Sequence, residues 1–61
     1  MKATVIRIGD DKNNGKVLVD IDKRTKGSCW TRNIPADLAV GDRIEVCWAP
    51  CAPHCEFVSR I

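Results

Sequence analysis

The chain has 61 residues, enough for one domain but not for two. Hydrophobic residues make up 44% and charged residues 30%, a composition typical of a folded protein rather than a disordered one. No apolar run approaches the ~18 residues of a transmembrane helix, and the N-terminal stretch lacks the apolar core of a signal peptide. We therefore expect one domain over residues 1–61, with no membrane insertion and a cytoplasmic location.

The charge is small but unevenly distributed. The formal net charge is +2. Residues 1–26 hold seven basic and four acidic side chains, a net +3, whereas residues 27–61 hold three basic and four acidic, a net −1. A mild basic excess favours an anionic partner. It is weaker than the basic footprint of a dedicated duplex-DNA-binding protein, which argues against that class.

The first half of the chain predicts a β-hairpin. Residues 2–8 are rich in β-branched side chains, and residues 16–23 alternate between apolar and polar positions, as a half-buried strand does. Between them, residues 10–15 form a polar turn that ends in Asn-Gly, the dipeptide best suited to positive φ.

The second half predicts three further strands. A basic turn at residues 23–28 leads into a strand at residues 28–34, and residues 42–49 alternate again. The segment 35–42 is a compact connection with room for one short helical turn. Residues 56–61 predict the last strand, because two prolines break any regular structure before it.

Five short strands separated by turns predict an all-β fold, a small five-stranded antiparallel barrel. Closure into a barrel removes the exposed edges that a flat sheet of five strands would leave. An OB-like barrel is the first choice and an SH3-like barrel is the alternative. The alternating pattern assigns seven residues to the core: Val5, Val17, Val19, Ile21, Ile44, Val46 and Trp48.

Three short runs resemble known OB domains. These are Gly15-Lys16-Val17-Leu18-Val19-Asp20, Gly27-Ser28-Cys29-Trp30-Thr31 and Val40-Gly41-Asp42-Arg43-Ile44-Glu45-Val46. Together they are similar to the OB domain of NfeD-type membrane proteins, and the last run also resembles the fourth strand of S1-like RNA-binding barrels. The resemblance covers about residues 15–58 and implies the barrel fold. The chain departs from the NfeD pattern in its cysteine-rich segment.

A loop rich in cysteine and proline covers residues 47–55. Zinc favours four thiolate or imidazole ligands in a tetrahedron, so a possible zinc site would use the four cysteines, with His54 as a substitute ligand. The cysteines are Cys29, Cys47, Cys51 and Cys55. Their C-x3-C-x3-C spacing in the loop differs from the paired C-x2-C of zinc ribbons. Two other interpretations stay open: reduced thiols that pack as small apolar groups, and two disulfides in one of three connectivities.

Strand alternation makes a geometric prediction for the cysteines. Cys47 lies on the strand face opposite Val46 and Trp48, and Cys29 lies opposite Trp30, so both point out of the core. Cys51 and Cys55 follow in the proline-stiffened loop. We therefore expect the four thiols to converge at one end of the barrel.

The residues argue against catalysis. A thioredoxin-type site needs C-x-x-C at a helix N-terminus, and no cysteine pair here has that spacing. His54 adjoins Cys51 and Cys55, but a barrel this small offers little wall for a substrate pocket. We expect a binding module and not an enzyme.

Single-stranded RNA or DNA is the first candidate ligand, because such binders stack bases on aromatic side chains within a basic groove. The candidate contacts are Trp30, Arg32, Arg7, Lys23, Arg24 and Lys26. Two outward carboxylates on the second strand, Asp20 and Asp22, oppose this reading. Trp30 as a core residue, with the lysines as solubilising charge, is the competing interpretation. A protein partner, including a second copy of the chain, is the alternative ligand.

Overall fold

The computed structural model describes residues 1–22, 27–50 and 54–61. These residues form five strands and one short 3-10 helix: β1 (Lys2–Ile8), η1 (Asp11–Asn13), β2 (Val17–Ile21), β3 (Ser28–Arg32), β4 (Arg43–Trp48) and β5 (Cys55–Arg60). The all-β class is confirmed, and every predicted strand is present. Within the described ranges, no helix has the length and apolar character needed to cross a membrane.

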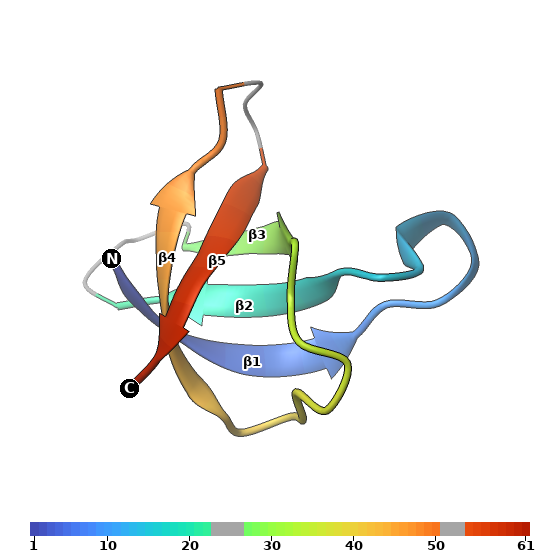
Figure 1. Cartoon of the computed structure of the whole chain (residues 1–61), viewed down its shortest axis with the longest axis horizontal. Coiled ribbons are helices and arrows are strands. Elements are labelled where there is room, and N and C mark those ends of the chain that lie inside the picture. Colours follow the sequence, from blue (N-terminus) through green and yellow to red (C-terminus); the bar gives the residue numbers. More distant parts are fainter. Residues whose placement is uncertain (23–26, 51–53) are drawn as a thin grey trace.

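The strands close into a barrel in the order β1-β2-β3-β5-β4, with β4 returning to β1 (Figure 1). Four of the strand pairs are antiparallel, and the β3–β5 pair is parallel. The prediction of an entirely antiparallel barrel is therefore wrong at this seam. The reason is geometric: an odd number of strands cannot alternate in direction all the way around a closed barrel. The architecture is compatible with an OB-like fold, and an SH3-like barrel is also plausible.

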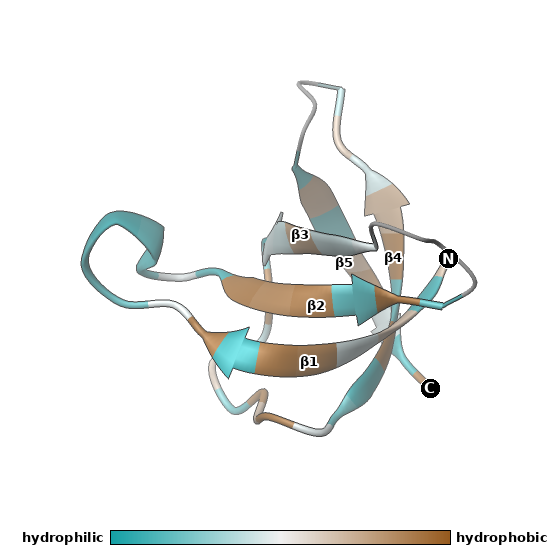
Figure 2. Cartoon of the chain, turned by 180° about the vertical axis from the view of Figure 1, so that it is seen from behind, coloured by the Kyte–Doolittle hydropathy of each residue, from teal (hydrophilic) through white to brown (hydrophobic). Residues whose placement is uncertain are grey.

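The core consists of short and β-branched apolar side chains that point inward from all five strands. Six of the seven predicted core residues are buried: Val5, Val17, Val19, Ile21, Ile44 and Val46. Each buried methylene group contributes about 0.8 kcal/mol to the free energy of folding, so these side chains are the main source of stability in a small domain. Figure 2 shows the matching apolar stretch along the middle of β2 and β1.

Trp48 is the exception, because its side chain is 44% exposed. β1 pairs with β4 only from Arg43 to Glu45, whereas Trp48 pairs with Cys55 of β5. The end of β4 therefore extends past its pairing with β1, and Trp48 is partly open to solvent there although it lies directly opposite the buried Cys55. The prediction that Trp48 belongs to the core is wrong for this reason.

The turn between β1 and β2 is held by a close backbone approach at Gly9. Its N–H donates to the Lys16 carbonyl at 2.9 Å. A Cβ atom on this residue would lie 2.2 Å from the Asn13 carbonyl oxygen, so only glycine fits. Gly15 has a φ of +81°, as expected of the Asn-Gly turn. The turn is hydrophilic and extends away from the barrel (Figure 2).

Candidate nucleic-acid interface

Trp30 lies on the outer face of the barrel. On β3, Cys29 and Thr31 are buried, whereas Trp30 and Arg32 are half-buried on the opposite face. The prediction that Cys29 points out of the core is therefore wrong, and so is the interpretation of Trp30 as a core residue. The interior of a five-stranded barrel is narrow, so at this level it holds the small side chains and leaves the indole outside.

The neighbours of Trp30 on this face are set by the strand register. Trp30 is the direct partner of Leu18 on β2, and Leu18 is the direct partner of Arg7 on β1. Directly opposed residues lie on the same face of a sheet. An irregularity between Val5 and Arg7 shifts the β1–β2 register and places Arg7 at this position. The result is an outer row across three strands, which we call the Arg7–Leu18–Trp30 row.

Two further cations lie close to this row. Lys16 directly precedes β2 and lies two positions before Leu18 in the sequence. Arg32 follows Trp30 by two residues, but its Nε and Nη2 donate to Oε1 of Glu56 at 3.2 and 2.9 Å. Arg32 is thus already paired with a carboxylate on β5. Among the described residues, Arg7 and Lys16 have no ion pair.

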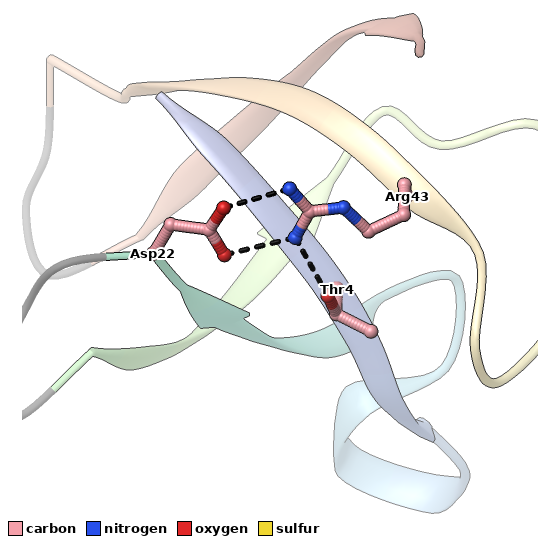
Figure 3. Close-up of polar contacts among 3 residues, drawn as sticks. All are labelled: Thr4, Asp22 and Arg43. Carbon is pink, nitrogen blue, oxygen red and sulfur yellow. Dashed lines mark hydrogen bonds and ion pairs between the residues drawn. The ribbon is translucent and has the colours of Figure 1, made fainter.

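The two opposing carboxylates are in different situations. Asp20 is exposed and is the cross-strand partner of Ser28, so it flanks the row. Asp22 is held by Arg43, whose Nη1 and Nη2 donate to its two carboxylate oxygens at 2.8 and 2.7 Å (Figure 3). The repulsion of phosphate expected from Asp22 is therefore offset by a cation.

The Arg43 guanidinium also ties three strands together. Its Nη1 donates to Oγ1 of Thr4 at 2.9 Å, so a side chain from the start of β4 reaches over β1 to the residue after β2 (Figure 3). The hydrogen bonds to Asp22 raise the pKa of Arg43 above its ordinary value. The side chain is therefore charged throughout the usual pH range, and this brace is independent of pH on the arginine side.

Three of the six predicted contacts, Lys23, Arg24 and Lys26, lie outside the described residues. The sequence places them between Asp22 and Gly27, and so between β2 and β3. Sequence reasoning missed Leu18 and Lys16. The alternation along β2 puts Leu18 on the face opposite Val17 and Val19, and this is the signal that points to it. Lys16 directly precedes this strand.

A depression lies at one end of the barrel, beside the β1–β2 turn. Its volume is about 360 Å³, within the range of small-molecule sites. Ile8, Val17, Ile34, Pro35 and Leu38 form its apolar wall, and Lys16 stands at its polar side. Lys16 lies two positions before Leu18 in the sequence, so the start of β2 contributes to both features.

The sequence predicts that all four cysteines converge, and the structure brings together two of them, Cys29 and Cys55. The sulfur atoms of Cys29 and Cys55 lie 2.7 Å apart in the core. Cys47 is exposed on β4, as predicted, and Cys51 lies outside the described residues. Among the residues that the structure describes, no group of three metal-ligating side chains is present. His54 is the substitute ligand. Its Nδ1 is buried and has no hydrogen-bond partner among the described residues.

Comparison of the chain with protein-family models, with curated proteins and with solved structures gave no match in any of the three. The resemblance to NfeD-type and S1-like OB domains therefore has no support from a match. The closed five-stranded barrel is compatible with the fold that the resemblance implies.

Proposed function

We propose that this barrel is a non-catalytic module that binds single-stranded nucleic acid along the outer face of β1, β2 and β3. The observation that carries the proposal is the Arg7–Leu18–Trp30 row, in which an aromatic, an aliphatic and a cationic side chain stand side by side across three strands.

The row has the chemistry that a single strand requires. The Trp30 indole offers a flat surface for one base, and stacking of this kind contributes about 1–3 kcal/mol per base. Leu18 extends the apolar surface beside it. Arg7 and Lys16 flank the row as cations without a described carboxylate partner, so they are available for phosphate. Every base has a π-face, and we expect binding with little sequence preference.

Two features limit the affinity. Asp20 adds an exposed negative charge next to the row. Glu56 forms an ion pair with Arg32 and so competes with phosphate for that guanidinium. We therefore expect moderate affinity and a small number of phosphate contacts. Lys23, Arg24 and Lys26, which follow β2 in sequence, remain candidate cations for phosphate.

The test is a fluorescence titration of the full chain with Trp48→Phe, which leaves Trp30 as its single tryptophan. Oligonucleotides of about ten nucleotides match the site size of one OB fold. We expect saturable quenching by oligo-dT or oligo-U, with log affinity falling against log salt by about 0.7 per phosphate contacted. Comparing the two oligomers distinguishes DNA from RNA. Unchanged fluorescence at ~20 mM salt, where electrostatic binding is strongest, would overturn the proposal.

A protein-binding module is the second candidate, and exposed apolar side chains are the observation in its favour. Among the described residues, six large ones are 44–61% exposed: Ile6, Ile8, Val40, Trp48, Val58 and Ile61. Exposed apolar surface beyond a few hundred Å² marks protein contacts. Sedimentation of the chain over a range of concentrations tests self-association. A monomer that binds oligonucleotide at every concentration would remove the homo-oligomer from consideration.

A further inference from the structure

The two buried cysteines meet across the parallel seam of the barrel. Cys55 is the direct partner of Thr31, and Cys29 precedes Thr31 by two residues on the same inward face of β3. The two cysteines are thus diagonal neighbours on adjacent strands, separated by 26 positions in the sequence. Their exposed fractions are 9% and 0%, and their sulfur atoms lie 2.7 Å apart.

This seam has the shortest strand pairing in the described barrel. β3 and β5 pair through two residue pairs, Thr31 with Cys55 and Arg32 with Glu56, whereas every other pair of strands has three or more. On the outer face the Arg32–Glu56 ion pair crosses the seam, and on the inner face the two thiols cross it. The closure of the barrel therefore depends on few backbone hydrogen bonds.

The distance between the sulfurs distinguishes the chemistries open to this pair. A disulfide holds them at ~2.05 Å, so the pair is ~0.7 Å from bonding distance. Two thiolates on one tetrahedral zinc, with Zn–S of ~2.3 Å, stand ~3.8 Å apart, so the pair would have to separate by ~1.1 Å. The arrangement therefore fits a disulfide better than a shared zinc ion.

We propose that Cys29 and Cys55 form a disulfide bond that locks β3 to β5. The oxidant is a disulfide of the glutathione class. The Cys29 or Cys55 thiolate attacks this disulfide, forms a mixed disulfide and expels one small thiol. The second cysteine then attacks the mixed disulfide, which forms the Cys29–Cys55 bond and releases the second small thiol. Two protein thiols are oxidised, one external disulfide is reduced, and the two protons pass to the released thiolates.

Because both cysteines are buried, exchange requires transient opening of the seam or takes place during folding. The bond would close a loop of 26 positions, which restricts the unfolded chain. For a domain of this size we expect oxidation to raise the melting temperature by ~10 °C or more. This inference is independent of the nucleic-acid proposal, because it concerns the inside of the barrel.

The experiment uses the full chain and a matched variant with Cys47→Ser and Cys51→Ser, which retains only the two buried cysteines. Both proteins are incubated with oxidised glutathione and analysed by mass spectrometry without reduction. Trypsin cuts after Lys26, Arg32, Arg43 and Arg60, so Cys29 lies in peptide 27–32 and Cys55 in peptide 44–60. In the variant, a link between these peptides can only be Cys29–Cys55.

We expect this cross-linked pair in both proteins, a loss of two hydrogens per disulfide, and a fall in melting temperature when the variant is reduced. A wild-type protein in which Cys55 is linked to Cys51 instead would overturn the proposal. So would one zinc ion per chain in the native mass, with thiols that stay reduced until the metal is removed by a chelator. If the variant does not fold, the linked peptides 27–32 and 44–60 of the wild-type protein decide the outcome, because their fragmentation spectrum shows which of Cys47, Cys51 and Cys55 is bonded to Cys29.

Discussion

Leu18 and Trp30 lie directly opposite each other on β2 and β3, and both side chains point away from the core. This pairing makes an apolar platform on the outside of the barrel, next to the charged side chains of Arg7, Asp20 and Arg32. The alignment of this pair with Arg7 on β1 is the reason for assigning the ligand to this face.

Replacing Trp30 tests the platform directly. Trp30→Leu keeps an apolar side chain but removes the surface for stacking, which contributes about 1–3 kcal/mol per base. We expect oligonucleotide affinity to fall by ~5- to 150-fold, measured by anisotropy of a labelled oligomer, with the melting temperature nearly unchanged. Trp48→Leu is the control, because Trp48 lies on β4 outside the row. An equal loss in both variants would contradict the assignment of this face.

Releasing Arg32 from its carboxylate should strengthen binding. Glu56→Gln removes the charge that Arg32 now contacts at 2.9 Å. We expect a several-fold gain in oligonucleotide affinity and a salt dependence steeper by about 0.7, because one more cation reaches phosphate. Arg32→Gln is the matched control and should change affinity little, because that guanidinium is already paired. A loss of affinity in Glu56→Gln would show that the ion pair supports the interface instead.

The two carboxylates beside the row should respond differently to neutralisation. Asp22→Asn breaks a two-bond contact with Arg43, so we expect a small decrease in melting temperature at low salt that disappears at high salt. Asp20→Asn should leave the melting temperature unchanged and raise oligonucleotide affinity, because it removes an exposed charge next to the row. Thermal melts at two salt concentrations check the first result, and titrations check the second. Equal melting behaviour of the two variants would argue against the Arg43 brace.

The β1–β2 turn should not tolerate a side chain at Gly9. Gly9→Ala places a Cβ atom 2.2 Å from the Asn13 carbonyl oxygen and 2.7 Å from that of Lys16, so the backbone must move. We expect a loss of about 1–3 kcal/mol in the free energy of unfolding, measured by urea denaturation. Gly15→Asn is the comparison, because that position is open and asparagine tolerates positive φ. A Gly9→Ala protein as stable as the Gly15→Asn protein would contradict the close approach.

Much of the fold follows from local patterns. The alternation of Val17, Val19 and Ile21 places β2 and its buried face, and the Asn-Gly dipeptide places the turn before it, because both signals depend only on neighbouring residues. The same reasoning locates Arg7 and Arg32 on strands. It fails for Trp48 and Cys29, where burial depends on which strand lies alongside.

By itself, the sequence determined five strands, their turns and six of the seven predicted core residues, because period-two patterning reports the buried face of a strand. Only the tertiary structure decided the row and the seam. An odd number of strands in a closed ring requires a parallel pair, and this pair brings Cys29 to Cys55 across 26 positions. A shifted register on β1 aligns Arg7 with Leu18. The Cys29–Cys55 contact joins residues far apart in the chain, and the Arg7–Leu18 pair depends on an irregularity in β1, so no local pattern in the sequence could show either of them.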